Sequence, residues 1–381
     1  MTNISNKDKI YFQHLDVVRF LAAFMIVILH AYEAWNGWFG HLPLLSSNNT
    51  KEFSTIGVYI DLFIRNLGIG VDIFFVISGF LITYILLEEK KRFGRISIFK
   101  FMVRRSLRIW PLYFFIIALA PFLVAWVNKN PPDYLYNLLF LNNFNGIQTQ
   151  RWTYPFGHFW SICVEEHFYI VWPFIIALIP KKRLLPTFYL LIFGSILFRI
   201  WTLHTSDHVW YELFLHTISR VDVIIIGAIG AYYYSEKKFE FKLSRNLRVL
   251  LLVVLVLALS IESVALWNTA FLAGFKKYFY VIIFSVLLLD FNLNTNYKHL
   301  IPNKSIFHYL GKVSYGIYMY SNVLLLIVIK KIMWVYEIKS AFAFFAIIFT
   351  LSIVIPIISY ELFEKHILKL NKFFRVIKTE R

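Results

Sequence analysis

The chain is short of cysteine and of charged residues. Cys163 is the single cysteine among 381 residues, which excludes an internal disulfide and a cysteine-built metal site. Only 16% of the residues are charged, against about a quarter in soluble globular proteins. Hydrophobic residues make up 59% of the chain, with 40 Phe, 23 Tyr and 11 Trp. This composition is typical of an integral membrane protein.

Acidic residues are scarce relative to basic ones. The chain has 22 Asp and Glu against 39 Lys and Arg, and its formal net charge is +17. Such a charge could indicate a nucleic-acid partner. In a membrane protein it has a simpler cause, because cytoplasmic loops are enriched in Lys and Arg. We therefore expect a lipid bilayer as partner and no nucleic acid.

Apolar segments of about 20 residues, the length needed to cross a bilayer, recur along the whole chain. Two further runs, Ile56–Ile64 and Tyr134–Leu141, are too short to span and are expected at the interface or re-entering beside the bundle. The pattern predicts an all-α, polytopic membrane bundle of about ten transmembrane helices in one domain, residues 1–381. The expected spans are 15–33, 68–87, 107–127, 160–179, 184–203, 217–234, 247–266, 276–291, 312–330 and 341–362.

The distribution of positive charge predicts the orientation. If the N-terminus is cytoplasmic, 26 Lys and Arg lie in cytoplasmic segments and 9 in segments on the other side. This bias predicts that both termini are cytoplasmic. The first span contains Arg19 and is followed by no small-residue cleavage site, so we expect it to be retained.

The first span carries ionisable side chains that hydrocarbon should exclude. Arg19 and His30 are eleven residues apart, which is about three helical turns, so both side chains lie on one face of the helix. Ionisable groups inside a membrane usually face the protein interior or a water-filled cavity. The charge bias directs Arg19 toward the cytoplasm and His30 toward the outer side.

The second span and the segment after it contain more such groups. Asp72 lies near the predicted outer end of its span, and Arg105 and Arg108 share a helix face at the predicted inner boundary. Paired guanidinium groups can hold phosphate through bidentate hydrogen bonds. The alternative is ordinary positive-inside anchoring with contact to lipid headgroups.

A polar and aromatic segment, WSICVEEHFYIVWP, opens the fourth predicted span. It contains Ser161, Glu165, Glu166 and Tyr169, where the pairs 161/165 and 166/169 are spaced to meet on a helix. Carboxylates and aromatic rings together suit a ligand rich in hydroxyl groups. The alternative is an aromatic belt whose glutamates reach headgroup water.

Two other groups of polar residues stand out in the later part of the chain. Arg220 and Asp222 are two residues apart, so they point to different faces and are expected to pair with other buried charges. His204, His208 and His216 have spacings that could place them on one face, but no acidic or cysteine ligand accompanies them. We predict no metal site.

Five stretches in this order resemble the membrane acyltransferase-3 family of bacteria, over nearly the whole chain. The family has an arginine and a histidine eleven residues apart in its first helix, an Arg-x-x-Arg pair, and a tryptophan-serine segment with a double glutamate. This chain matches these features, and also VDIFFVISGFLI around Asp72 and SYGIY at Ser314–Tyr318. It departs at Ser321, where the family often has histidine, so no second histidine role is transferred to that position.

The resemblance implies an O-acyltransferase that moves acetyl from acetyl-CoA to a sugar hydroxyl of a surface polysaccharide or its lipid-linked precursor. Arg105 and Arg108, with Arg19, would hold the phosphates of the donor. His30 would act as general base or as a transient acyl carrier, because imidazole titrates near neutrality. The remaining expected catalytic residues are Arg19, Asp72, Glu165 and Glu166, and the expected substrate contacts are Trp160, Ser161, Tyr169 and Tyr315.

Acetyl-CoA would be a substrate, with no permanently bound cofactor, and the bacterial inner membrane is the expected location. The acceptor, part of an O-antigen, capsule or exopolysaccharide, is expected to reach the membrane site itself, because no hydrolase-like domain follows the last span. Another acyl donor, such as succinyl-CoA, stays open. The rival functions are a transporter or flippase for a glycan intermediate and a structural subunit of a glycan machine.

Overall fold

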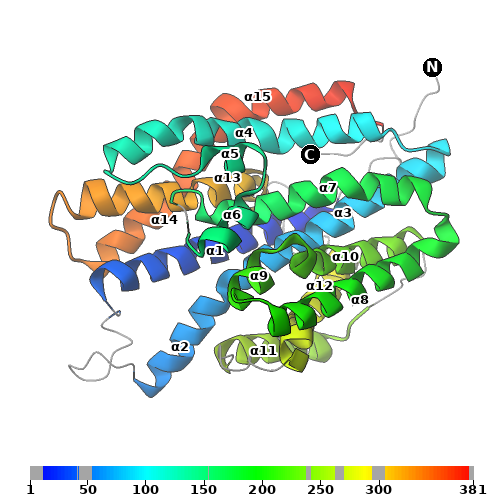
Figure 1. Cartoon of the computed structure of the whole chain (residues 1–381), viewed down its shortest axis with the longest axis horizontal. Helices are drawn as coiled ribbons and strands as arrows, with labels where there is room; N and C mark the ends of the chain where they lie inside the picture. The colour runs from blue at the N-terminus through cyan, green and yellow to red at the C-terminus, as the bar shows by residue number, and fades with distance from the viewer. Residues whose placement is uncertain are drawn as a thin grey trace.

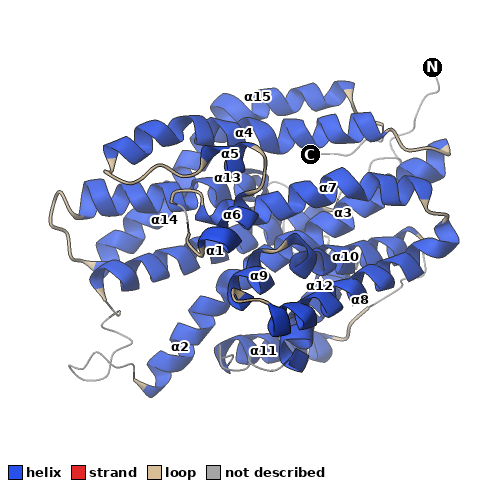
Figure 2. Ribbon diagram, viewed as in Figure 1, coloured by secondary structure: helices blue, strands red, loops and turns tan. Residues whose placement is uncertain are grey.

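The computed structural model describes residues 12–40, 42, 54–152, 154–236, 242–261, 270–293 and 305–376. Every regular element in these ranges is a helix, and most of them run along the long axis of the molecule (Figures 1 and 2). The long helices are α1 (Gln13–Phe39), α3 (Ile69–Phe93), α4 (Ile98–Trp126), α7 (Trp160–Leu178), α8 (Lys181–Thr205), α10 (Thr217–Ser235), α11 (Arg245–Ile261), α12 (Ala270–Leu293), α13 (Ile306–Ile327) and α14 (Ala341–Ser359).

Short helices connect or extend these long ones. They are α2 (Thr55–Arg65), η3 (Asn66–Gly68), α5 (Tyr134–Leu138), α6 (Asn142–Thr149), η4 (Gly157–Phe159), α9 (Val209–Leu215), η7 (Val328–Met333), η8 (Tyr360–Glu364), α15 (Lys365–Leu368) and η9 (Lys369–Phe373). Local capping sets several of the helix ends. Ser54 Oγ accepts a hydrogen bond of 3.0 Å from the Gly57 amide at the start of α2. Gly94, with φ of 68°, ends α3 in the left-handed conformation that glycine tolerates.

The predicted all-α membrane bundle is confirmed. Within the described residues, eight helical segments are long and apolar enough to cross a membrane. They contain eight of the ten predicted spans. At the positions of the other two, 247–266 and 276–291, the structure has α11 and α12, which are not among these eight, so the count of ten stays a prediction.

The two short apolar runs form helices in the structure. The run Ile56–Ile64 lies in α2, which continues through η3 into α3, so that Ile56–Phe93 is one candidate span of 38 residues. The run Tyr134–Leu141 contains the five-residue α5. The bounds of the two apolar runs therefore indicate where α2 and α5 lie. The apolar pattern did not predict that α2 continues into α3.

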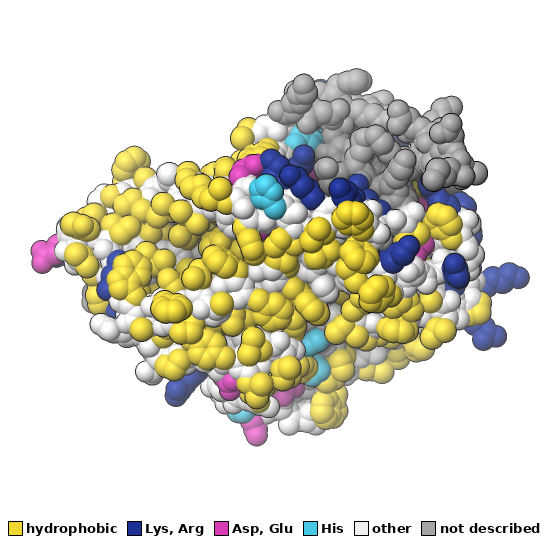
Figure 3. Space-filling model, turned by 90° about the horizontal axis from the view of Figure 1, so that it is seen from above, with side chains coloured by type: hydrophobic (Ala, Val, Ile, Leu, Met, Phe, Trp, Pro, Cys, Tyr) yellow, Lys and Arg dark blue, Asp and Glu magenta, His cyan; other side chains and the backbone are white. Residues whose placement is uncertain are grey.

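The outer surface of the bundle is suited to lipid. Large apolar side chains are exposed along α4 and α8, including Phe122, Leu190 and Trp201. Hydrophobic side chains cover most of the face shown in Figure 3, and Lys and Arg lie mainly toward its margins. An exposed apolar surface this broad is typical of a membrane protein rather than of a soluble monomer.

Glycines allow the central helices to pack closely. A Cβ atom at Gly79 of α3 would overlap the carbonyl of Ile224 in α10, and one at Gly227 would overlap the carbonyl of Val76. A Cβ atom at Gly311 of α13 would likewise overlap the carbonyl of Asp16 in α1. Small residues permit this backbone approach between membrane helices. The α3–α10 and α1–α13 pairs therefore form the rigid frame around the site.

Candidate active site

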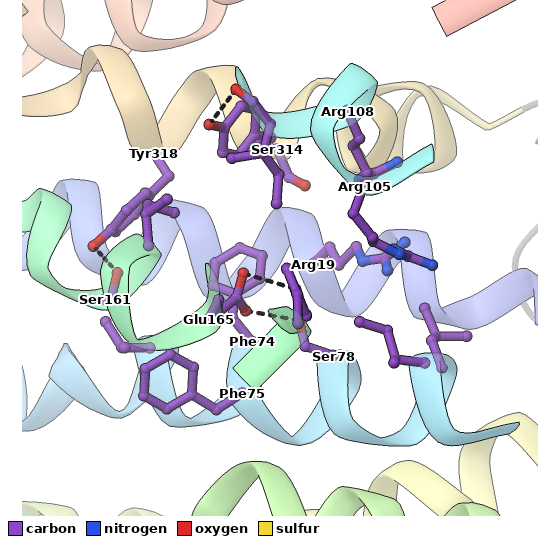
Figure 4. A pocket seen from close by; sticks show the side chains of 17 residues that line it. Arg19, Phe74, Phe75, Ser78, Arg105, Arg108, Ser161, Glu165, Ser314 and Tyr318 are labelled. Carbon is purple, nitrogen blue, oxygen red and sulfur yellow. Dashed lines mark hydrogen bonds between the residues drawn. The ribbon is translucent and has the colours of Figure 1, made fainter. Parts of the chain in front are cut away.

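A pocket of about 730 Å³, its open mouth included, lies between helices α1, α3, α4, α7 and α13. Arginines lie at one end of it, and the hydroxyl groups of Ser161 and Tyr318 meet at the other (Figure 4). Its polar lining residues are Arg19, Ser78, Arg105, Arg108, Ser161, Glu165, Tyr169, Ser314, Tyr315 and Tyr318. Seven of the residues expected from the sequence thus meet in one cavity, although their chain positions span almost 300 residues.

The arginine end carries positive charge with little compensation. Arg19 Nη1 lies 3.4 Å from Asp16 Oδ1, but Arg105 and Arg108 have no ion pair with any carboxylate in the described part of the chain. Arg105 Nε is buried and has no hydrogen-bond acceptor there. Buried charges are usually paired, so this end of the pocket is chemically incomplete without an anion.

The neighbouring Arg104 shows the contrast on the same helix. Arg104 Nη2 lies 3.5 Å from Glu89 Oε2, and its Nη1 donates to the Phe374 carbonyl at 2.6 Å. The Arg105 guanidinium instead lies over two rings, 5.9 Å from the centre of Tyr169 and 5.6 Å from that of Phe101. Cation–π contacts hold a guanidinium in place while leaving its N–H groups for a ligand.

Glu165 occupies the middle of the pocket and is fixed by two hydroxyl groups. Ser78 Oγ donates to Glu165 Oε1 at 2.7 Å, and the Tyr169 hydroxyl donates to Glu165 Oε2 at 3.0 Å. The Tyr169 hydroxyl also lies 3.1 Å from Ser78 Oγ. Tyr169 therefore pairs with Glu165 at i, i+4, where the sequence spacing suggested Glu166 at i, i+3.

Ser161 and Tyr318 close the opposite end. Their hydroxyl oxygens are 2.7 Å apart, and the Tyr318 hydroxyl donates to the His158 carbonyl at 2.6 Å. The Ser161–Glu165 contact suggested by the sequence is replaced by this contact with α13. His158 thereby lies directly behind the end of the pocket.

His30 lies beside this end and is not among the described residues that line the pocket. Its ring is in edge contact with His158, with 6.2 Å between ring centres. His30 Nδ1 is buried and has no hydrogen-bond partner among the described residues. The helix that carries Arg19 into the arginine end thus carries His30 to the other end, as their spacing predicted.

Besides His30, three expected site residues lie outside the pocket lining. Asp72 Oδ1 accepts from Arg220 Nη2 at 2.8 Å, and the Trp160 ring lies 5.4 Å from that guanidinium carbon. Glu166 Oε2 accepts from Trp110 Nε1 at 3.1 Å. Roles for Asp72, Trp160 and Glu166 in the chemistry therefore stay predictions. Tyr315, by contrast, lines the pocket and donates to the Ile109 carbonyl at 3.0 Å.

The sequence reasoning missed three residues of this site. Ser78 and Tyr318 lie in the quoted VDIFFVISGFLI and SYGIY stretches, but no role was assigned to either of them. His158 precedes the polar segment of α7 by two residues. A histidine three residues before Ser161, where η4 leads into α7, was the available signal for His158. Ser78 and Tyr318 are recognised only from their contacts with residues of other helices, which the spacing along the sequence cannot predict.

The fold and this pocket define a class of protein: a polytopic helical bundle with a buried cavity. At one end of the cavity, Arg105 and Arg108 have no carboxylate partner among the described residues, and hydroxyl groups lie at the other end. The family model described as an acyltransferase domain, acyltransferase 3, matches residues 12–361. The chain therefore belongs to this acyltransferase family, as the resemblance of its motifs implied.

Similar proteins agree with this assignment. O-acetyltransferase OatA of Staphylococcus aureus (strain NCTC 8325 / PS 47) is 24% identical over 278 residues, covering 66% of this chain and 45% of OatA. An uncharacterized protein of Haemophilus influenzae is 36% identical over 123 residues, covering 29% of this chain and 50% of that protein. The chain thus spans less than half of OatA. No solved structure matches the chain.

Proposed function

We propose that the protein is an integral membrane O-acyltransferase that takes an acyl group from an acyl-coenzyme A, most simply acetyl-CoA, and transfers it to a glycan hydroxyl. The observation that carries this proposal is the arginine end of the pocket, where Arg105 and Arg108 face the cavity without a carboxylate among the described residues. An anionic, elongated ligand would complete this charge. Coenzyme A, whose phosphates lie far from its thioester, fits that requirement.

The donor would lie along the pocket. Guanidinium groups bind phosphate bidentately, so Arg105 and Arg108, with Arg19, would hold the phosphates at one end. The thin pantetheine arm would follow the cavity past Glu165 toward Ser161 and Tyr318 (Figure 4). The Ser161 hydroxyl could turn from Tyr318 and donate a hydrogen bond to the thioester carbonyl oxygen as this oxygen gains negative charge. The thioester would then lie near His30.

His30 would supply the proton or acyl chemistry. An imidazole can take the proton of an attacking hydroxyl as general base, or it can accept the acyl group transiently. Its buried Nδ1 has no hydrogen-bond partner within the described residues, which keeps a ring nitrogen uncommitted. Glu165, held by Ser78 and Tyr169, would orient the polar groups around the acyl carbon.

The charge bias along the sequence supports a direction for the transfer. If the basic segments are cytoplasmic, the arginine end would open toward the cytosolic pool of acyl-CoA and His30 would face the outer half of the membrane. The acceptor would be a sugar of a surface polysaccharide or of its lipid-linked precursor in the bacterial inner membrane. The name of OatA, an O-acetyltransferase, supports acetyl as the group transferred.

The test is thioester cleavage by the purified full-length protein in lipid nanodiscs. We expect acetyl-CoA to yield free CoA thiol, and labelled acetyl to appear on lipid-linked glycan extracted from the source cells. His30→Ala should abolish the transfer. His14→Ala, which replaces another buried histidine of α1, should retain it.

Two outcomes would overturn the proposal. One is that the wild-type protein binds CoA but releases no CoA thiol from acetyl-CoA with any acceptor tested. The other is movement of a labelled glycan carrier across vesicles without any acyl transfer, which would favour the transporter alternative.

A further inference from the structure

Two histidines from different helices meet behind the far end of the pocket. His30 belongs to α1, and His158 lies in η4, immediately before α7. Their rings are 6.2 Å apart between centres and inclined by 71°. His158 is only 3% exposed. Two imidazoles in contact inside an apolar core are an uncommon arrangement, because each brings polar nitrogens that need partners.

The hydrogen bonds of His158 determine which nitrogen carries the proton. Its Nε2 lies 3.1 Å from the Met319 carbonyl oxygen, and a carbonyl can only accept. Nε2 of His158 is therefore the protonated nitrogen, and Nδ1 of the neutral ring has a lone pair. That Nδ1 is buried and has no partner among the described residues. An uncommitted lone pair next to a reactive site is the property of a general base.

The backbone around His158 is anchored to the pocket. Its carbonyl accepts from the Tyr318 hydroxyl at 2.6 Å, and its ring lies 5.2 Å from the Tyr318 ring. Tyr318 and Ser161 both line the cavity. The position of His158 is thus coupled to the two hydroxyl groups nearest to the expected acyl carbon.

We propose that His158 is the general base of the transfer step and that His30 carries the acyl group. This inference rests on the proposed function. The described structure has no hydrogen bond between the two rings, and both Nδ1 atoms lack partners. A single hydroxyl oxygen of the acceptor, placed beside the two rings, could attack the acyl carbon on His30 while its proton passes to the lone pair of His158.

The first half-reaction forms a C–N bond and breaks a C–S bond. A ring nitrogen of His30 attacks the thioester carbonyl, the electron pair of the C–S bond leaves with sulfur, and the thiolate takes the proton that the acylated imidazolium loses. The products are neutral acyl-His30 and CoA thiol.

The second half-reaction uses His158. The acceptor oxygen attacks the acyl carbon while its proton passes to His158 Nδ1. The C–N bond breaks with its electron pair staying on the departing nitrogen. His158 returns the proton to the other ring nitrogen of His30, the one that lost its proton in the first half-reaction. Both histidines end as they began, so no further reactant is required.

The experiment uses His158→Gln in the full-length protein, in nanodiscs, with radiolabelled acetyl-CoA. The Gln amide can still donate to the Met319 carbonyl but provides no base. We expect one equivalent of CoA thiol to be released and label to remain on the protein at His30, with transfer to glycan slowed about 10²- to 10⁴-fold, the usual contribution of a general base. His308→Gln, a matched change of another buried histidine, should leave both half-reactions unchanged.

The possible outcomes separate the two proposals. Transfer by His158→Gln at the wild-type rate would overturn the role of His158 and leave the proposed function intact. A variant that loses thiol release and protein labelling together would also overturn it, because the base would then not be specific to the second step. No thiol release by the wild-type protein would instead overturn the proposed function itself.

Discussion

Two buried clusters of basic side chains in this bundle have opposite surroundings. In one, Arg199 of α8 and Lys277 of α12 both contact Asp222 of α10, at 2.7 and 2.8 Å. The Tyr278 hydroxyl donates to Asp222 at 2.5 Å and accepts from Arg199 at 2.8 Å. In the other, Arg105 and Arg108 face a pocket and lack a carboxylate partner in the described structure.

The difference distinguishes a structural cluster from the proposed binding site. A buried charge is costly unless it is paired and hydrogen-bonded. The Asp222 cluster meets that condition within the protein and joins three helices. The arginine end of the pocket does not meet it among the described residues, and under the proposed function an anionic ligand would supply the missing partner. Changes in the first cluster should therefore affect stability, and changes in the second should affect affinity.

The largest effect is expected from Asp222→Asn. This change leaves Arg199 and Lys277 buried without their shared carboxylate, and breaking a buried pair costs about 3–5 kcal/mol. Thermal unfolding in detergent micelles should show a much lower midpoint and poor yield. Glu361→Gln, in an exposed pair with Lys365 at 2.7 Å, is the control and should leave the unfolding midpoint nearly unchanged. Equal midpoints for the two variants would contradict the structural role.

Arg105→Gln should weaken donor binding without lowering stability. Losing a hydrogen bond to a charged group costs about 1.5–3 kcal/mol, which is roughly a 10- to 100-fold increase in the Kd for CoA. Calorimetric titration of CoA into protein in nanodiscs measures this directly. Arg104→Gln, which removes the pair with Glu89, should do the reverse and lower stability while retaining affinity. If Arg105→Gln binds CoA like the wild type, the phosphates lie elsewhere.

The smallest effects are expected from two separate variants, each of which removes one tyrosine hydroxyl: one in the Asp222 cluster and one in the pocket. Tyr278→Phe removes the hydroxyl that contacts Arg199 and Asp222, and it should cost about 1–2 kcal/mol of stability with unchanged thiol release. Tyr318→Phe removes the hydroxyl that contacts Ser161 and His158, and it should slow the reaction more than it destabilises the fold. Unfolding midpoints and initial rates of both variants check the comparison. A loss of rate in Tyr278→Phe together with a loss of stability alone in Tyr318→Phe would contradict this comparison.

Much of the architecture follows from the pattern of apolar residues. Spans of the length that a bilayer requires predicted eight helical segments that the structure contains, and the eleven-residue spacing placed Arg19 and His30 on one stripe of α1. The prediction that Arg220 and Asp222 do not pair with each other is also confirmed. Arg220 pairs with Asp72 and Asp222 with Arg199.

The site was only partly predictable, because its contacts join residues distant in the chain. Glu165 bonds with Ser78, 87 residues away, and Ser161 with Tyr318, 157 residues away. Helical spacing suggested partners within α7 instead. Adjacent Glu165 and Glu166 look equivalent in the sequence, yet Glu165 lines the pocket and Glu166 accepts from Trp110. Neighbouring positions on a helix point about 100° apart, so only the packing decides which one faces the cavity.

The sequence by itself determined that this protein is a membrane bundle of the acyltransferase class, because span length, charge bias and ordered motifs are local properties. The tertiary structure decided which buried cations have a carboxylate partner and which, among the described residues, have none. It also brought His158 to His30, since that contact depends on how α1 and the start of α7 pack against α13. A second imidazole, which the serine at position 321 does not supply, is present beside His30 after all.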